Sequence, residues 1–369
     1  MRIAFYAPLK PPDHPTPSGD RRIARLFLEA LRLAGHDPFV AARLRSYEGA
    51  GDGRRQARLA GVAAGAAERL IRGWRTQPRA APELWFTYHL YYKAPDWLGP
   101  AISEALGIPY VVAEASTAPK RAGGDWDIGH RAVEAALRRA ALVVGLNPVD
   151  RACVLPLLGD PRRWIALPPF LDARRYAAPH AGKSSAPPRL ITVAMMRHGD
   201  KLASYRLLGT ALARLDDLSW SLDIVGDGPA RGEVERALAP LGSRVVYRGL
   251  LDEAAIAAAL AAADLFVWPA INEAVGMALL EAQASGLPVV AGASGGVGGI
   301  VAAGETGLLA RPGDVSSFAA ATRSLILDGA ARAAMGAAGR QKIRREHDLP
   351  AAGRRLAAAI DGLGRVQAA

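Results

Sequence analysis

The segment from Trp268 to Gly292, "WPAINEAVGMALLEAQASGLPVVAG", holds two acids, Glu273 and Glu281, with seven residues between them. The apolar run "DLFVWPA", which overlaps its start, predicts a buried strand, and "LPVVAG" at its end predicts another. Between them an apolar helical run begins near Gly276. One carboxylate is therefore expected in the loop after a strand, and the other inside the following helix.

The same alternation of strand and helix extends outward through the whole chain. In the second half of the chain, the strands expected before Trp268 are "RLITVAMM", "SWSLDIVG" and "RVVYRGL", and the helices expected between them lie near 202–215, 231–240 and 252–263. In the first half, the expected strands are "RIAFYAP", "DPFVAA", "ELWFTY" (83–88), "PYVVAEAS" (109–116) and "ALVVGLN" (141–147). Such repetition is typical of α/β proteins with parallel, doubly wound sheets.

The pattern predicts two Rossmann-like domains that face a central cleft. The expected boundaries are an N-terminal domain at 1–168, a Pro-rich linker at 169–188, a second domain at 189–349, and a C-terminal helix at 350–369 that packs back on the N-terminal domain.

Composition limits the class of protein. The single cysteine, Cys153, excludes a disulfide framework within the chain and favours a reduced, cytosolic setting. We expect no signal peptide, because the first residues carry one basic side chain and Pro8 breaks their apolar run. The net charge of +11 suits anionic partners such as nucleotides, anionic lipid or nucleic acid, or an arginine-rich surface solvated by water.

One basic helix is expected over residues 54–75. Its apolar stripe and the arginines near its ends would suit an anionic membrane surface, but packing on its own sheet is the favoured interpretation.

Loops at the carboxyl ends of parallel strands are where such sheets bind ligands. The loop after "LITVAMM" supplies two cations, Arg197 and Lys201, that suit a diphosphate, and the helix near Gly276 begins with free N–H groups. Gly19, at the start of the first helix, offers similar backbone donors. Glu273 and Glu281 are acceptors, which suit the hydroxyl groups of a nucleotide sugar.

The segment 189–328 resembles the group 1 glycosyltransferases, glycosyltransferase family 4, which have the GT-B fold. The matching motifs are "MRHGDK", "IVGDGP", the run from "VVYRGLLDEAA" to "LPVVAG", and "GETGLLARPGD", while "SGDRRIARLFLEALRLAGHDP" resembles the family's first loop and helix.

The resemblance implies a retaining hexosyltransferase that uses a nucleotide-diphosphate sugar and no cofactor, with 1–168 as its acceptor-side domain and 189–349 as its nucleotide-sugar-binding domain. We expect the enzyme to be metal-independent, because Arg197 and Lys201 can do the electrostatic work of a metal ion. Arg197 and Lys201 would neutralise the leaving diphosphate, and Glu273 would face the donor sugar. Glu281 would hold the ribose hydroxyls. The remaining donor contacts would come from Gly19, Gly249, Leu250, Leu251, Ala274, Val275, Gly276 and Met277.

Two positions depart from the family pattern. Glu114 stands where many members have a histidine, so His89 and Glu114 are the candidate acceptor-side residues, and Gly299 replaces an acid. "GDGPARG" is interpreted as a donor-site loop, not as a nicotinamide motif. Asp125 and Asp127 imitate a metal-binding D-x-D, but we expect no metal there.

The resulting prediction is a cytoplasmic enzyme, with peripheral contact at the inner face of the membrane and a role in polysaccharide biosynthesis. Its acceptor is a glycan, lipid or small molecule. The alternatives are a nucleotide-sugar epimerase of the same fold and a basic nucleic-acid-binding protein without catalytic activity. Base, sugar and acceptor stay open.

Overall fold

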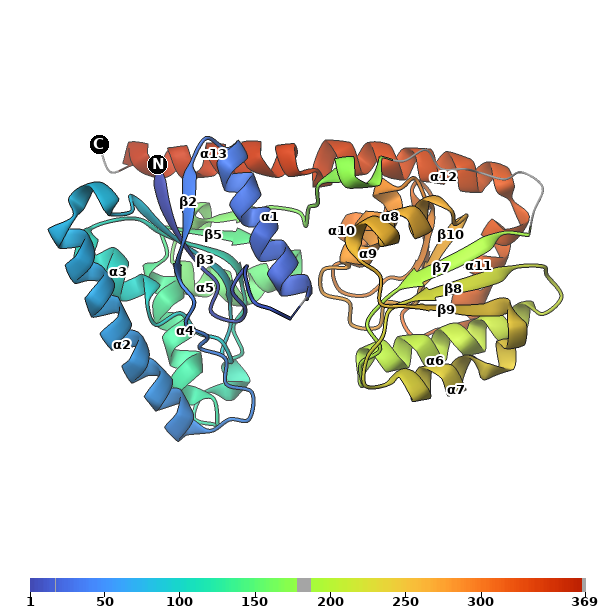
Figure 1. Ribbon diagram of the computed structural model, residues 1–369, viewed down its shortest axis with the longest axis horizontal. Helices are drawn as coiled ribbons and strands as arrows, with labels where there is room; N and C mark the ends of the chain where they lie inside the picture. Colours follow the sequence, from blue (N-terminus) through green and yellow to red (C-terminus); the bar gives the residue numbers. More distant parts are fainter. Residues whose placement is uncertain (17, 178–186, 367–369) are drawn as a thin grey trace. The chain divides into compact units, whose positions relative to one another are not determined.

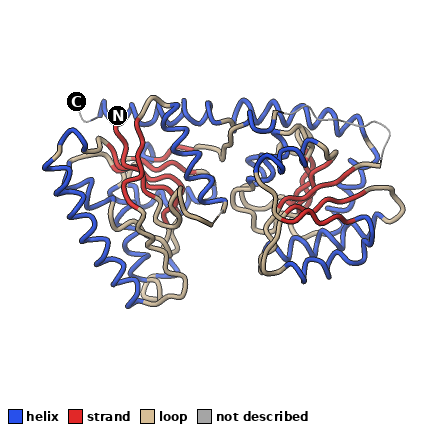
Figure 2. Tube along the Cα trace, in the orientation of Figure 1, coloured by secondary structure: helices blue, strands red, loops and turns tan. Residues whose placement is uncertain are grey.

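The chain forms two compact α/β units in the computed structural model, which describes residues 1–16, 18–177 and 187–366 (Figures 1 and 2). The first unit combines Met1–Pro168 with the segment that begins at Leu349, and the second spans Pro169–Asp348. The second unit is therefore one continuous stretch, whereas the first is assembled from both ends of the chain.

The first unit is built on a six-stranded parallel sheet with the order β2-β1-β3-β4-β5-β6. Its strands are β1 (Arg2–Tyr6), β2 (Asp37–Ala42), β3 (Leu84–Leu90), β4 (Tyr110–Ala115), β5 (Leu142–Gly145) and β6 (Trp164–Ala166). Its helices are α1 (Gly19–Leu33), α2 (Gly53–Thr76), α3 (Gly99–Leu106), α4 (Asp127–Arg139), α5 (Arg151–Leu158) and α13 (Leu349–Val366). β6 was not anticipated, because three residues are too few to show a period.

The second unit repeats the architecture with the order β12-β11-β10-β7-β8-β9. Its strands are β7 (Arg189–Val193), β8 (Ser221–Val225), β9 (Val245–Gly249), β10 (Leu265–Trp268), β11 (Val289–Gly292) and β12 (Gly307–Ala310). Its helices are α6 (Asp200–Leu212), α7 (Arg231–Leu238), α8 (Glu253–Ala261), α9 (Met277–Ala284), α10 (Val297–Ile300), α11 (Val315–Leu327) and α12 (Gly329–Lys342). A π-helical turn, Ile343–His347, follows α12.

Part of the expected linker at 169–188 is folded into the second unit. Residues 169–177 belong to the second unit, where Leu171 and Tyr176 are buried. Leu171 also donates its backbone N–H to the carbonyl of His347 at 2.9 Å. Residues 178–186 of the expected linker lie outside the described residues. The helix that begins at Leu349 packs on α1 in the first unit, where a Cβ at Gly353 would lie 3.2 Å from the carbonyl oxygen of Ala30.

Each sheet has one place where the order of strands reverses direction. In the first unit β1 lies between β2 and β3, and in the second β7 lies between β8 and β10. At such a switch point the loops after the two central strands run to opposite faces and leave a crevice at the carboxyl edge. Functional side chains are therefore expected on the loops after β1 and β3, and on those after β7 and β10.

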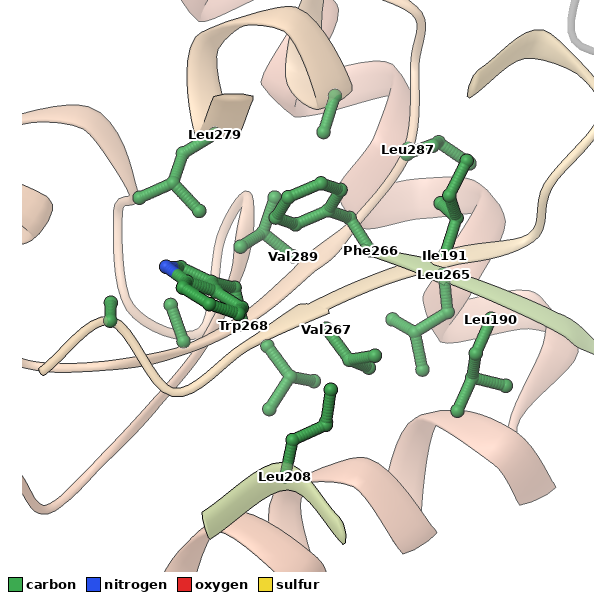
Figure 3. Packing of buried hydrophobic residues seen from close by; sticks show 14 of the residues in the cluster. Leu190, Ile191, Leu208, Leu265, Phe266, Val267, Trp268, Leu279, Leu287 and Val289 are labelled. Atoms are coloured by element: carbon green, nitrogen blue, oxygen red, sulfur yellow. The ribbon is translucent and has the colours of Figure 1, made fainter. Parts of the chain in front are cut away.

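The core of the second unit is centred on β10, whose four residues are each at most 2% exposed. Successive side chains of a strand point to opposite faces. Figure 3 shows Phe266 on the side of Leu279 of α9 and Val267 on the side of Leu208 of α6. Burial on both faces fixes the strand, and with it the loop that follows.

The basic helix α2 packs within the first unit through Ala63 and Ala67, while most of its arginines are exposed. Among the described residues, no helix combines the length and the hydropathy needed to cross a membrane.

Asp96 organises the buried polar part of the first unit. It is 1% exposed, and its carboxylate accepts hydrogen bonds from the side chains of Thr87, Trp85 and Tyr110. Its other oxygen accepts the backbone N–H groups of Leu98 and Gly99, each at 2.8 Å, at the start of α3. One carboxylate thus satisfies donors from β3, β4 and α3.

We expect Asp96→Ala to lower the free energy of unfolding of the first unit by roughly 3–5 kcal/mol, because several buried donors lose their acceptor at once. Urea denaturation monitored by circular dichroism measures this change. Asp37→Ala, an exposed substitution on β2, serves as the control and should change stability by less than about 0.5 kcal/mol. Equal stabilities for the two variants would contradict the role given to Asp96.

Candidate functional site

The switch point of the second unit brings the loops after β7 and β10 together. Arg197 is exposed in the loop after β7. Lys201 lies in the first turn of α6, and the N-cap residue of this helix, Gly199, has a positive φ of 77°. Glu273 comes from the loop after β10. Elements far apart in sequence therefore supply cations and a carboxylate to one edge.

Lys201 and Glu273 form an ion pair within this edge, with 2.5 Å between Nζ and Oε2. The indole N–H of Trp268 donates to the same Oε2 at 3.2 Å, and Nζ of Lys201 lies 5.4 Å from the centroid of the indole. The side chain of Glu273 is 16% exposed, so the charge is held in place without being sealed from solvent. Oε1 of Glu273 has no hydrogen-bond partner within the described part of the chain, so it remains open to a ligand hydroxyl.

The loop after β10 has an unusual backbone, because two of its residues have a positive φ although neither is glycine. Ala270 and Asn272 have φ values of 54° and 50°, in the left-handed region. Hydrogen bonds from α6 hold this loop: the N–H of Ile271 donates to Ser204 Oγ at 3.0 Å, and the Asn272 amide donates to Asp200 at 3.0 Å. Strain of this kind persists only where surrounding contacts impose it, and it clusters at functional sites.

The N-terminus of α9 follows this loop directly. Its N-cap residue, Gly276, has a φ of 67° and makes no side-chain hydrogen bond to the helix. The first N–H groups of a helix have no partner inside the helix and carry a partial positive charge. The backbone from Ala274 to Met277 is therefore suited to bind an anion or sugar hydroxyls.

A glycine loop packs against this backbone and fixes its position. A Cβ at Gly295 would lie 2.2 Å from the carbonyl oxygen of Glu273, and a Cβ at Gly296 would lie 2.2 Å from that of Ala274. Only glycine permits such approach. Gly299, by contrast, would have no atom within 4 Å of an added Cβ, and its carbonyl accepts a hydrogen bond from Lys342 at 3.2 Å.

Glu281 lies within α9 and is only 4% exposed. Glu281 is therefore not a solvated acid on the surface of the helix. Leu250 is the opposite case, since 76% of this apolar residue is exposed. It follows Gly249, which has a φ of 66°, and Leu251 is partly buried. Gly249, Leu250 and Leu251 therefore form an apolar turn at the end of β9, open to a flat ligand surface.

The switch point of the first unit carries a different set of side chains. Gly19 is exposed at the start of α1, and the next residue, Asp20, shares a hydrogen bond with Nδ1 of His89 at 3.0 Å. His89 and Glu114, near the ends of the adjacent strands β3 and β4, have left-handed φ values of 66° and 55°. Asp20 had not been singled out from the sequence.

The electrostatics of this group are dominated by acids. Burial lowers the pKa of His89, but the carboxylates of Glu114 and Asp20 outweigh it and hold that pKa above its ordinary value. Asp150, in the turn after β5, has a pKa raised to about 6 by burial and by the charge of Glu114, against the opposite influence of His89. Asp150 had also been missed, because no motif marks it.

Asp125 and Asp127, the two acids of the D-x-D pattern, contact groups of the protein itself. Asp127 pairs with Arg131 at 2.8 Å and accepts the N–H of Gly123, while Asp125 accepts a side-chain hydrogen bond through its backbone carbonyl. Within the described ranges, no group of three or more His, Cys, Asp or Glu side chains is placed to hold a metal ion.

Comparison with known protein families finds a match within the second unit. The family model for glycosyl transferases group 1 matches residues 187–328, the part of the chain that contains the Lys201–Glu273 pair and α9.

Three curated relatives show how far the similarity extends. The 2-deoxystreptamine N-acetyl-D-glucosaminyltransferase of Streptomyces fradiae is 30% identical over 311 residues, which cover 78% of this chain and 71% of that protein. The 2-deoxystreptamine glucosyltransferase of Streptomyces kanamyceticus is 31% identical over 63% of this chain and 59% of its own. The sulfoquinovosyl transferase SQD2 of Arabidopsis thaliana is 34% identical over 38% of this chain and only 27% of its own.

Solved structures share the whole two-unit fold. Sucrose-phosphate synthase from Thermosynechococcus elongatus aligns with a TM-score of 0.73 at 20% identity, covering 99% of this chain and 100% of the other. Anabaena HepE in complex with UDP-glucose aligns with a TM-score of 0.71 at 18% identity, covering 98% and 100%. At these identities the likeness shows the fold alone. The fold is that of the two-domain α/β glycosyltransferases, as expected.

The packing of Gly295 and Gly296 against the backbone before α9 can be tested by substitution. We expect Gly296→Ala to destabilise the second unit by roughly 1–3 kcal/mol and to speed amide exchange at residues 273–277, because the added methyl group collides with the carbonyl of Ala274. Hydrogen exchange with mass spectrometry measures both effects. Gly298→Ala is the matched control, since nothing lies within 4 Å of that position. Unchanged exchange in the Gly296 variant would show that the loop does not position this backbone.

Proposed function

The chain belongs to the group 1 glycosyltransferases, and from this membership we propose that it transfers a hexose from a nucleotide-diphosphate sugar to an acceptor with retention of configuration. The observation that supports this most directly is the Glu273 carboxylate, held by Lys201 and Trp268 just before the N-terminus of α9. A cation, a carboxylate and free backbone donors at one edge match the diphosphate and sugar of such a donor.

Each part of the donor has a proposed partner. The diphosphate binds Arg197 and Lys201, and the sugar binds Glu273 and the backbone of Ala274, Val275, Gly276 and Met277. Buried Glu281 accepts the ribose hydroxyls, and the turn formed by Gly249, Leu250 and Leu251 borders the base.

The proposed reaction forms a bond between an acceptor hydroxyl oxygen and the anomeric carbon. The bond from that carbon to the diphosphate oxygen breaks, and the nucleoside diphosphate leaves with the electron pair. Its oxygen then takes the proton of the acceptor hydroxyl, so no strong protein base is required. Positive charge grows on the sugar and negative charge on the phosphate, where Arg197 and Lys201 stabilise it. We propose that these cations make a metal ion unnecessary and that the enzyme uses no cofactor.

The acceptor side is assigned to the first unit, with His89 and Glu114 as its candidate residues. Two of the relatives have names that specify 2-deoxystreptamine, whereas the names of others specify lipopolysaccharide core biosynthesis or a phosphatidylinositol monomannoside. A small molecule, a glycan and a lipid are thus all represented, as are roles in polysaccharide biosynthesis. We propose a cytoplasmic enzyme whose exposed arginines on α2 make peripheral contact with the anionic inner face of the membrane.

Binding of the donor nucleotide tests the proposed function. We expect UDP, GDP or ADP, at about 100 times its dissociation constant, to stabilise the protein by about 2.7 kcal/mol. The corresponding nucleotide sugar should then support transfer that a strong chelator does not abolish. Differential scanning fluorimetry and chelator-treated turnover assays measure these two results. Release of free nucleotide with an altered sugar and no acceptor product would favour the epimerase instead.

The two acids should have separable roles. Glu281→Ala removes charged hydrogen bonds to hydroxyls that do not react, so the donor KM should rise roughly 10- to 150-fold. Glu273→Gln keeps the shape but removes the charge that faces the developing positive charge on the sugar, so kcat should fall more than KM changes. Steady-state kinetics with one donor compare the two variants.

The control for both variants is Glu235→Gln on α7, which removes an equal charge from a partly exposed position where Glu235 pairs with Arg231. Its kinetic constants should match those of the unmodified enzyme. If Glu273→Gln altered only KM, or Glu281→Ala only kcat, the division of roles between these carboxylates would be wrong.

A further inference from the structure

We propose that Lys342, at the end of α12, is a positioning residue for the donor-binding loop that carries Glu273. Its ammonium group holds the carbonyl of Gly299 in α10, and the N-cap residue of α10, Gly296, binds the backbone of this loop. The same ammonium group joins α10 to the two segments at which the chain enters and leaves the second unit. This role rests on the proposed function and adds to it a residue outside the donor site that sets the geometry of Glu273.

The ammonium group of Lys342 has three acceptors within hydrogen-bond distance. Its Nζ lies 3.2 Å from the carbonyl oxygen of Gly299, 2.7 Å from Oε2 of Glu346 and 2.9 Å from Nε2 of His347. A lysine ammonium group has three N–H donors and no acceptor. Since the side chain of Lys342 is only 11% exposed, its donors are committed to these contacts and not to solvent.

The partners of His347 fix its protonation state. This residue is 0% exposed, and its Nδ1 lies 2.7 Å from the carbonyl oxygen of Pro169, so Nδ1 carries a proton. A second proton on Nε2 would point at the ammonium group of Lys342, so the ring is neutral and Nε2 accepts. Glu346 supplies the compensating negative charge, and the hydrogen bond from Lys342 is the main cause that lowers the pKa of Glu346 to about 2.

His347 belongs to one of two boundary segments, 169–173 and 347–348, where the chain enters and leaves the second unit. The N–H of Leu171 donates to the carbonyl of His347 at 2.9 Å. Leu171 also forms a parallel bridge with Asp348. The two boundary segments are therefore hydrogen-bonded to each other, and Lys342 contacts both the histidine and α10.

From Gly299 the contacts lead to the donor-binding loop. The N–H of Gly299 donates to the carbonyl of Gly296 at 3.1 Å, and the N–H of Gly296 donates to the carbonyl of Glu273 at 3.0 Å. A Cβ at Gly296 would collide with the carbonyl oxygen of Ala274, so the two backbones are in direct contact. A shift of Gly299 therefore acts on the backbone that carries the Glu273 carboxylate.

A second cation of α12 supports α9 from its other end. α12 packs on α9 (Figure 1), and Nη2 of Arg340 donates to the carbonyl of Ser285, the C-cap residue of α9, at 2.6 Å. Cations stabilise the last carbonyl groups of a helix. Gln283 of α9, which is fully buried, donates to the carbonyl of Ile300 in α10 at 3.2 Å. The last turn of α12 thus holds the end of α9 through Arg340, and the loop before α9 through Lys342.

Hydrogen exchange with mass spectrometry tests the role of Lys342. Lys342→Met keeps most of the apolar side chain and removes the ammonium group, so three acceptors lose their common donor. We expect exchange at 273–277 and at 169–173 to become roughly 10-fold faster. Exchange in β7 and β8 should stay unchanged, because these strands lie in the core of the same unit but outside the proposed contacts.

Arg344→Met is the matched control, because it removes one positive charge from an exposed side chain in the adjoining π-helical turn. It should leave exchange at 273–277 unchanged. Should Lys342→Met fail to fold, Lys342→Gln serves the same comparison. It keeps N–H donors on a shorter side chain, so it should show the same pattern with smaller changes.

The coupling to the boundary segments is tested with UDP, GDP or ADP, whichever stabilises the unmodified protein. Saturating nucleotide should slow exchange at 273–277 and also at 169–173. In Lys342→Met the effect at 169–173 should be lost, because coupling between two sites requires the contacts that join them. Failure of all three nucleotides to bind the unmodified protein would defeat the proposed function, whereas the exchange of the nucleotide-free variants would still decide the role of Lys342.

Turnover gives a readout that a merely structural role would not move. Release of nucleoside diphosphate from the matching nucleotide sugar, with water as the acceptor, measures kcat and the donor KM. We expect Lys342→Met to lower kcat roughly 10- to 100-fold and to change KM less, because a small displacement of Glu273 misplaces its charge relative to the sugar. Arg344→Met should match the unmodified enzyme in both constants.

Three results would overturn the proposal. The first is exchange at 273–277 in a folded Lys342 variant that matches the unmodified protein. The second is equal acceleration at 273–277 and in β7 and β8, which would make Lys342 a general stabilising contact. The third is an unchanged kcat in Lys342→Met although exchange at 273–277 is faster.

Discussion

The parallel pairing of β7 with β10 is the contact on which the donor-binding edge depends. Leu190 pairs with Leu265, and Ile191 with Phe266, although the two strands are separated by two complete strand–helix units. This pairing creates the reversal of strand order. It also brings the ends of both strands to one edge, so that Lys201 reaches a carboxylate 72 residues away in the sequence. Burial of β10 on both faces holds the register, because a slip by one residue would turn Phe266 and Val267 to the wrong sides.

Much of this arrangement follows from local patterns in the sequence. The strands and helices recur with clear periods, and the position of a residue after a strand is enough to assign it to the carboxyl edge. Lys201 and Glu273 could therefore be placed at the same edge before any contact was known. Their direct ion pair could not, because it depends on side-chain directions and on the left-handed turns at Ala270 and Asn272. Alanine rarely adopts such a backbone, and asparagine adopts it more readily but does not require it.

The residues missed by sequence reasoning share one property: their neighbours along the chain reveal nothing about them. Trp268 was placed in a strand, but its indole N–H reaches forward to the loop acid. Asp20 lies in the first turn of α1 and Asp150 in the turn after β5, and only the tertiary fold of the first unit brings them near His89 and Glu114. The short strands β6 and β12 pair in the sheets because a neighbouring strand offers free hydrogen-bonding groups, and this is a tertiary effect. Whether the individual site residues bind as assigned stays a prediction.

The two switch points of this chain have the same topology but carry different charged side chains. In the second unit, the carboxylate of Glu273 pairs with Lys201 and accepts the indole N–H of Trp268. In the first unit, one histidine faces several carboxylates: His89 pairs with Asp20, and the charge of Glu114 also raises the pKa of His89. Sheets with the same topology can thus carry different chemistry at equivalent edges, through the choice of a few residues.

The position of α13 also determines the order in which the two units can be completed. Met1–Pro168 of the first unit is synthesised before the second unit, yet the first unit lacks a helix until Leu349 and the residues after it have been added. The second unit is continuous and can complete its core earlier. At the usual rate of translation, α1 waits on the order of ten seconds or more with the surface around Ala30 uncovered. Of the two units, the one that is begun earlier is therefore completed later, and a nascent chain stalled before α13 would expose this surface of α1 to chaperones.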